Sequence, residues 1–424
     1  KARRIIIECG ELNWKDINPD IFGSMIQAVV NPEVRATQGM HYTSVPNIMK
    51  VINPLFLDEL RGEYNKMKER FDKVEQLWNL RGIKQKEYNA ECKTIIRDSN
   101  NLLKRMSAMK FFDPACGSGN FLIITYKSLR WLEMDILKLQ KQCQGEGGQM
   151  FVDNSVIRLD QFYGIELLDF PHEVAMLSLW LAEHQMNTKL NEEFGVDTKA
   201  LPLKNITQIV CGNACRLDWN VVCPHTKDEE VFVFGNPPYL GSKLQSIEQK
   251  NDISAAFYGI NNCRILDYIC CWFIYGTLYI KESNAKFAFV TTNSICQGEQ
   301  VGVLWPALLN NNVEILFAHK SFKWSNNAKY NAGVTCVIIG VGNMDNKCPK
   351  KIFDNNHSIY VNYINPYLIP NIRTIVFRSN ISPKGQPKLC FGCMPYDDKK
   401  RKHLRLDIFQ KDEMIRKYPE SEKF

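Results

Sequence analysis

The 424-residue sequence contains no uninterrupted apolar run that approaches the ~18 residues of a membrane span. Its amino terminus lacks the apolar core of a signal peptide. The one Cys-x-x-Cys, from Cys390 to Cys393, has no second pair nearby at zinc-binding spacing. These absences argue against a membrane protein, a secreted protein and a zinc domain, and we expect the chemistry to need no metal.

Neither sign of charge is strongly in excess. The chain has 53 basic and 46 acidic residues, a formal net charge of +7, which is compatible with a nucleic-acid partner without requiring one. Several of the 15 cysteines stand in apolar segments, where a free thiol acts as a small hydrophobic side chain. They are Cys211, Cys270, Cys271, Cys296 and Cys336. This usage predicts a reducing cytosol.

Residues 231–235 form an apolar run that stops at a glycine and continues as Asn236-Pro237-Pro238-Tyr239. The two prolines end a strand and stiffen the turn that follows. Such a turn suits a site in which the Asn236 side-chain oxygen and the Pro237 carbonyl accept hydrogen bonds from a flat amine while Tyr239 stacks on its ring. The competing interpretation is an ordinary loop with a proline pair.

A glycine-rich turn precedes this stretch. Residues 110–113 predict a short strand, Gly117 and Gly119 let the backbone pass close beneath a ligand, and a helical pattern extends to about residue 142. Phe121 and Leu122 follow where the dinucleotide fingerprint continues toward another glycine, which disfavours NAD. Glu166 ends the next strand, where it could bind ribose hydroxyls or be an exposed acid.

The order of elements predicts an α/β fold. We expect seven strands separated largely by helices, in a mostly parallel, doubly wound sheet. Their expected ranges are 110–113, 162–166, 208–211, 231–235, 287–291, 313–317 and 334–339. Apolar spacing predicts a helical hairpin from about residue 56 to 110, and Thr43 or Ser44 could cap the helix before it.

The two turns together carry a family resemblance. The run Asp113-Pro114-Ala115-Cys116-Gly117-Ser118-Gly119, followed on a later strand by Asn236-Pro237-Pro238-Tyr239, resembles the motif pair of S-adenosylmethionine-dependent DNA adenine-N6 methyltransferases, in the order of their γ group. The phrases at 121–127, 179–187 and 322–326 are similar to those of the MmeI-like single-chain restriction-modification enzymes.

This resemblance implies a Rossmann-like class I methyltransferase fold in which the first and fourth strands are neighbours. It implies catalytic roles for Asn236, Pro237, Pro238 and Tyr239. The cofactor, S-adenosylmethionine, would contact Tyr42, Thr43, Asp113, Ala115, Gly117, Gly119, Asn120, Phe121, Glu166 and Asn213. Asn213 departs from the acid common at its position in related enzymes. Phe322 or Trp324 would help to hold the target base.

The implied partner is double-stranded DNA with an adenine turned out of the duplex, in the cytoplasm of a bacterium. The expected domains are a helical region carrying the 39–44 motif (1–105), the catalytic domain (106–380), and a linker with the start of a target-recognition domain (381–424). We find no convincing Asp…Glu-x-Lys nuclease cluster before residue 105. We therefore expect a catalytic core whose nuclease and recognition domains belong to a larger parent chain.

Two alternatives stay open. The first is a protein glutamine N5-methyltransferase, an enzyme class in which an Asn-Pro-Pro-Tyr turn binds the side-chain amide of glutamine. A catalytically silent module that binds cofactor or DNA is the other.

Overall fold

The computed structural model describes Arg4 and residues 43–145, 154–195, 208–323, 335–344, 349–355, 357–370 and 374–377. Tyr42, Trp324 and the expected segment 381–424 lie outside these residues. The described residues up to Val376 belong to one compact unit. The predicted boundary near residue 105 is not tested by this division and stays a prediction.

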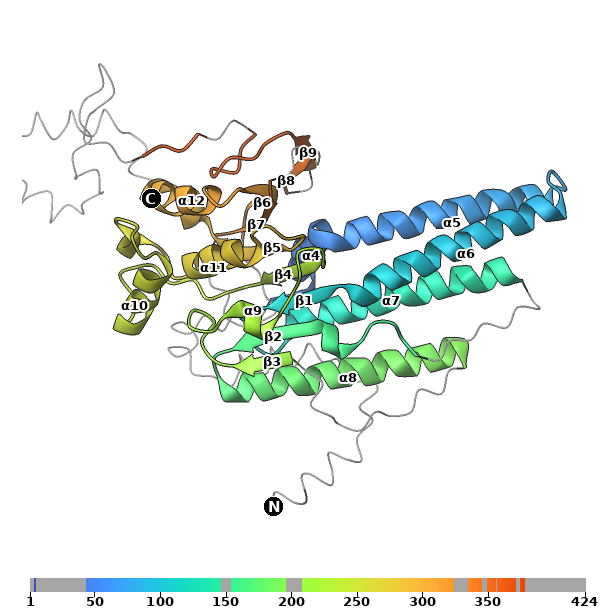
Figure 1. The fold of residues 1–424 in the computed structure, drawn as a ribbon, viewed down its shortest axis with the longest axis horizontal. Coiled ribbons are helices and arrows are strands. Elements are labelled where there is room, and N and C mark those ends of the chain that lie inside the picture. The colour runs from blue at the N-terminus through green and yellow to red at the C-terminus, as the bar shows by residue number, and fades with distance from the viewer. Residues whose placement is uncertain are drawn as a thin grey trace, which may run out of the picture. The chain divides into compact units, whose positions relative to one another are not determined.

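The described strands form one mixed sheet in the order β3-β2-β1-β4-β5-β7-β6-β8-β9 (Figure 1). Parallel pairs join β3, β2, β1, β4 and β5 in turn, whereas β7 runs antiparallel to both β5 and β6. The strands are β1 (Lys110–Asp113), β2 (Phe162–Glu166), β3 (Gln208–Cys211), β4 (Val231–Gly235), β5 (Lys286–Thr292), β6 (Val313–Lys323), β7 (Thr335–Asn343), β8 (Lys350–Asp354) and β9 (His357–Val361).

The α/β prediction is confirmed, but the number of strands was wrong: the described sheet has nine, not seven. The two extra strands, β8 and β9, extend the sheet beyond β6. Residues 357–360 of β9 are exposed, so this strand adds backbone pairing to the sheet and little to its apolar core. β6 continues to Lys323 because it stays paired with β7 as far as Thr335.

Helices cover both faces of the sheet. Alternate residues of each strand point to opposite faces, and apolar residues on both faces pack against helices. Phe111 and Phe232 belong to one apolar cluster with α4 to α8, and Phe112 and Val233 to a second with α9 to α12. The helices are α4 (Val45–Ile52), α5 (Asp58–Asn79), α6 (Gln85–Ala108), α7 (Asn120–Gln144), α8 (Asp169–Phe194), α9 (Trp219–Val222), α10 (Ile247–Ala256), α11 (Cys270–Ile280) and α12 (Val301–Leu309).

The predicted helical hairpin is confirmed: α5 and α6 lie side by side (Figure 1). Its base is tied to the sheet by Arg105 of α6. The guanidinium donates to Glu59 of α5 at 2.7 Å and to both carboxylate oxygens of Glu230, just before β4, at 2.6 and 2.8 Å. None of the described helices combines the length and apolarity needed to cross a membrane.

A pair of glycine substitutions tests how tightly β6 packs on β7. A Cβ built at Gly340 would lie 2.2 Å from the Phe317 ring, so Gly340→Ala must displace that buried ring. We expect it to lower the free energy of unfolding by roughly 1–3 kcal/mol. In α5, nothing described lies within 4 Å of a Cβ at Gly62, so the control Gly62→Ala should stabilise by about 0.5–1 kcal/mol.

Urea denaturation of the two variants and the wild type provides the measurement. Equal effects of the two substitutions would contradict the packing seen at Phe317.

Candidate active site

The turns after β1 and β4 emerge at the same edge of the sheet. Their strands pair in parallel, with Phe111 opposite Phe232 and Phe112 opposite Val233. At the strand ends, the Asp113 carboxylate lies against Gly235: a Cβ at Gly235 would be 2.5 Å from Asp113 Oδ1. The two sequence motifs are therefore in direct contact, and the contact needs a glycine on the β4 side.

The glycine-rich turn leads from β1 into α7. Gly117 and Gly119 have φ values of +55° and +84°, which residues other than glycine rarely adopt. A Cβ at Gly119 would also lie 3.2 Å from the Ala175 Cβ, so this glycine lets α8 pack closely. No described atom lies within 4 Å of a Cβ at Gly117, which leaves space there for a ligand.

Two acids flank this turn. Asp113 is 1% exposed, and its Oδ1 accepts from the Ala115 amide at 3.0 Å. Burial, together with the nearby Glu166, raises the pKa of Asp113 to about 8. Glu166 accepts from the amides of Gly117 at 2.9 Å and Leu168 at 3.0 Å. Burial raises the pKa of Glu166, while these hydrogen bonds oppose the shift.

Asn236 is held by a residue far away in the sequence. Its Nδ2 donates to Thr43 Oγ1 at 3.2 Å, and Thr43 is a buried residue just before α4. Among the described residues, the buried Asn236 Oδ1 has no hydrogen-bond partner. A buried carbonyl without a donor is costly, which is typical of an atom that waits for a ligand. Thr43, predicted as a cofactor residue, thus contacts the predicted catalytic amide.

The chain after Tyr239 is fixed by residues that the sequence analysis missed. Asp267 Oδ1 accepts from the Leu240 amide at 2.7 Å, and Gln245 Nε2 donates to the Leu240 carbonyl at 2.8 Å. Asp267 Oδ1 also accepts from the Ile269 amide at 3.3 Å. The sequence signal that could have identified Asp267 is an acid placed just before a helix rich in aromatic residues. Burial raises the pKa of Tyr239, whose hydroxyl forms a hydrogen bond with the Cys336 thiol.

The remaining predicted residues differ in their surroundings. Phe121 is 3% exposed and stacks on Phe234, so its backbone alone is left for a ligand. Asn120, at the start of α7, has a buried Oδ1 without a hydrogen-bond partner in the described part of the chain. Asn213 follows β3, and its amide is bound on both sides by the protein. At the end of β6, the Phe322 ring centroid lies 4.2 Å from the Lys50 ammonium nitrogen.

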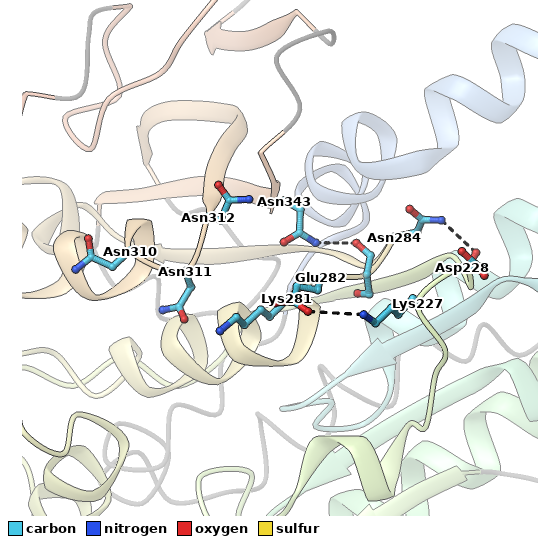
Figure 2. Close-up of a pocket in the computed structure, with 10 residues that line it drawn as sticks. Lys227, Asp228, Lys281, Glu282, Asn284, Asn310, Asn311, Asn312 and Asn343 are labelled. Carbon is cyan, nitrogen blue, oxygen red and sulfur yellow. Dashed lines mark hydrogen bonds and ion pairs between the residues drawn. The ribbon is translucent and has the colours of Figure 1, made fainter.

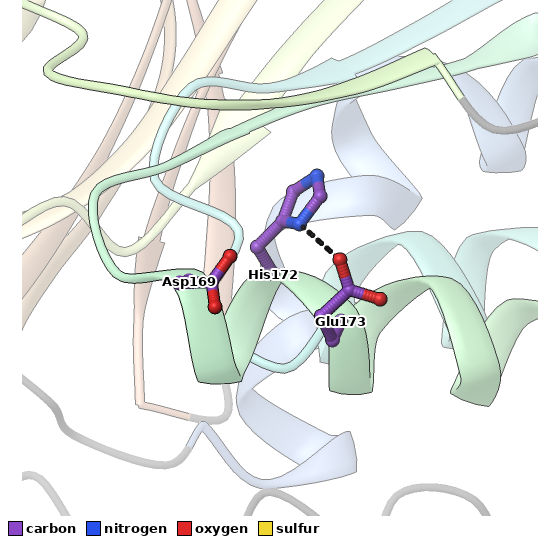
Figure 3. Close-up of side chains that lie close together, drawn as sticks. All are labelled: Asp169, His172 and Glu173. Carbon is purple, nitrogen blue, oxygen red and sulfur yellow. Dashed lines mark ion pairs between the residues drawn. The ribbon is translucent and has the colours of Figure 1, made fainter.

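A cluster that could hold a metal ion was found, in the described ranges, at the start of α8. Its ligand atoms, from Asp169, His172 and Glu173, lie within 4.8 Å of one another (Figure 3). His172 Nε2 is 3.1 Å from the Ile209 carbonyl, and its Nδ1 is 3.3 Å from Glu173 Oε1. Asp169 and Glu173 are exposed, and exposed acidic groups commonly gather without an ion. We assign no metal to this cluster, and metal-free chemistry stays a prediction.

A polar cavity of about 450 Å³ lies at the other edge of the sheet (Figure 2). Lys227 and Asp228 line it just before β4, and Asn284 lines it just before β5. These positions precede the amino ends of β4 and β5, whereas the candidate site lies beyond the carboxyl ends of β1 and β4. The cavity therefore takes no part in the candidate site.

Comparison with known proteins gives consistent matches. A model of the family described as MmeI, DNA-methyltransferase domain, matches residues 84–354. DNA methyltransferase A of Bacillus subtilis (strain 168) is 48% identical over 422 residues, which are 99% of this chain and 44% of that protein. A solved structure of the type IIL restriction-modification enzyme MmeI in complex with DNA has a TM-score of 0.78 at 36% identity, covering 100% of this chain and 53% of that one. The chain thus spans about half the length of these relatives.

The buried Asp113 predicts a specific dependence of stability on pH. The folded state holds this proton up to about pH 8, whereas an unfolded Asp releases it near its ordinary pKa of about 4. The contribution of Asp113 to stability is therefore complete below pH 4 and declines as the pH rises toward 8. Asp113→Asn removes this loss, so its stability relative to the wild type should rise between pH 5 and 8, by on the order of a few kcal/mol.

Urea denaturation of both proteins at pH 5 and pH 8 checks this expectation. A stability difference that does not change between the two pH values would show that folded Asp113 is already ionised at pH 5.

Proposed function

The chain belongs to the family of MmeI DNA-methyltransferase domains, and from this premise we propose that it methylates N6 of an adenine flipped out of double-stranded DNA. The methyl donor is S-adenosylmethionine, and the reaction belongs to a site-specific restriction-modification enzyme. Flipping exposes the amine, which the duplex otherwise pairs and stacks.

The observation that carries this proposal is the unpartnered Asn236 Oδ1. The exocyclic amine of adenine is a weak nucleophile because its lone pair is delocalised into the ring. An amide oxygen and the Pro237 carbonyl, both accepting from the amine hydrogens, would shift electron density back onto the nitrogen. They would also stabilise the positive charge that develops there during attack. Thr43 supports this role because it binds Nδ2 and leaves the oxygen free for the amine.

The carboxyl ends of β1, β2 and β4 form the proposed cofactor site, since ligands of open α/β sheets bind beyond the carboxyl ends of the strands. Bound S-adenosylmethionine would supply the methyl group from its sulfonium. The open space beside Gly117 would admit the ligand, and Glu166 would accept from the ribose hydroxyls. Asp113, with Ala115 and Gly119, completes the turn, and we keep Tyr42, Thr43, Asn120, Phe121 and Asn213 as proposed cofactor residues.

Tyr239 is the proposed stacking partner of the flipped base. Its position is set by the contacts of Leu240 with Asp267 and Gln245. Base–aromatic stacking contributes roughly 1–3 kcal/mol. Phe322 or Trp324 is the proposed second aromatic, and the Lys50 ammonium beside Phe322 leaves at most one face of that ring for a base.

Because the chain spans only about half the length of its relatives, we assign target recognition to other domains of the parent protein. Sequence is read by contacts to base edges in the grooves. The eleven cysteines of the described residues are free, which supports a reducing bacterial cytoplasm as the location.

Asn236→Ala in the full-length parent protein tests the proposal. It removes the oxygen that accepts from the amine, so methyl transfer should fall by about 10²–10³-fold, as for loss of one transition-state hydrogen bond. Cofactor affinity should hardly change. Tritium transfer from labelled S-adenosylmethionine to DNA and to a glutamine-containing peptide gives the readout. Label in the peptide and not in DNA would instead support a protein glutamine methyltransferase.

Thr43→Val keeps the shape of the side chain and removes its hydroxyl. Because Asn236 then loses the contact that orients its amide, we expect the turnover rate to fall by about tenfold, a larger effect than any loss of cofactor affinity from the proposed contact of Thr43 with the cofactor. The control Thr43→Ser retains the hydroxyl and should stay near the wild type. Weaker cofactor binding at an unchanged rate would instead limit Thr43 to the cofactor role that the family resemblance implies, and would contradict its role in orienting Asn236.

A further inference from the structure

The amide of Asn213 is bound by the protein on both of its ends. Its Oδ1 accepts from the Cys215 amide at 2.8 Å. Its Nδ2 donates to Asp252 Oδ2 on α10 at 3.2 Å. A carbonyl oxygen can accept two hydrogen bonds, so Oδ1 keeps one further lone pair, whereas the NH₂ end faces a carboxylate.

Asp252 is a buried carboxylate held by three side chains. It is 6% exposed, and its Oδ2 also accepts from the Tyr268 hydroxyl at 2.9 Å. Its Oδ1 accepts from Arg216 Nε at 2.8 Å. The three donors come from two parts of the chain: Asn213 and Arg216 follow β3, and Tyr268 precedes α11. The position of the Asp252 carboxylate is therefore determined independently of any ligand.

An amide side chain has two nearly isosteric orientations, which differ by exchange of its oxygen and nitrogen. An ionised carboxylate has acceptors only, so Asp252 accepts the NH₂ end of Asn213 and excludes the reversed orientation. The backbone amide of Cys215 makes the same selection from the other side. The Asn213 oxygen is thus set as an acceptor before a ligand arrives.

We propose that Asp252 is a positioning residue for the adenine of S-adenosylmethionine: it fixes the Asn213 amide so that Oδ1 accepts from the 6-amino group. This inference rests on the proposed function. The pair Asn213–Asp252 then presents a hydrogen-bond acceptor whose orientation the protein itself sets.

The same network reaches the catalytic turn. The Tyr268 amide donates to the Leu240 carbonyl at 3.0 Å, and the preceding Asp267 accepts from the Leu240 amide. A change at Asp252 could therefore disturb Tyr239 as well as Asn213. A useful test must separate recognition of the amino group from general damage to the site.

The experiment compares two ligands by calorimetric titration of the 424-residue chain. S-adenosylhomocysteine carries the 6-amino group, and S-inosylhomocysteine carries an oxygen in its place. The wild type should prefer the amino ligand by about tenfold or more, the difference expected for one buried hydrogen bond. Asp252→Ala should reduce this preference by about threefold or more, because only the Cys215 amide then selects the orientation of Asn213, while the affinity for the inosine ligand changes little. Glu248→Ala, an exposed acid on the same helix, should change neither affinity.

An exchange of the two side chains gives a second readout that does not depend on Asp252→Ala being folded. Asn213→Asp alone sets two carboxylates in contact and should weaken binding of the amino ligand by about tenfold or more. Asn213→Asp combined with Asp252→Asn restores one donor and one acceptor between them and should recover most of that loss.

The outcomes separate the two proposals. Equal weakening of both ligands by Asp252→Ala, or an unchanged preference, overturns the positioning role, as does failure of the exchanged pair to recover binding. If the wild type binds neither ligand, the proposed function itself fails.

Discussion

The candidate site depends on the close parallel pairing of β1 with β4. This pairing brings two turns, separated by more than a hundred residues, to one edge of the sheet, where the Asp113 carboxylate occupies the space that a side chain at position 235 would need. The carboxylate can approach so closely because residue 235 is a glycine. A ligand on the glycine-rich turn and a group bound by Asn236 would consequently be neighbours. The chemistry proposed for the chain requires that proximity.

Asp113 and Glu166 are buried acids whose described hydrogen bonds come from backbone amides rather than from basic side chains. Asp113 accepts from Ala115, and Glu166 from Gly117 and Leu168. Burial dominates and raises the pKa of both. Such acids are well suited to bind hydroxyl groups or a positive charge, because a ligand that donates to them replaces the water that burial removed. The destabilising effect of the acids on the empty protein is thus linked to what they can bind.

Distant segments fix the orientation of the two amides at this edge. Thr43, before α4, binds the nitrogen of Asn236, and Asp252, on α10, binds the nitrogen of Asn213. In each case the protein binds the NH₂ end, which leaves acceptor capacity on the oxygen. Both amides would therefore act as hydrogen-bond acceptors for amino groups, one on the proposed target base and the other on the proposed cofactor.

Local sequence was enough to predict the α/β class, the approximate position of seven strands, the α5–α6 hairpin and the two turns, because these follow from apolar periodicity and from the backbone preferences of glycine and proline. The turn residues themselves were also predicted, although their roles remain proposals. The structure alone decided that β8 and β9 join the sheet, that Thr43 contacts Asn236, and that Asp267 and Asp252 support the site. The reason is that a strand's place in a sheet depends on which distant strand it pairs with, and a single polar side chain carries no periodic signal. Both are set by how distant segments pack together.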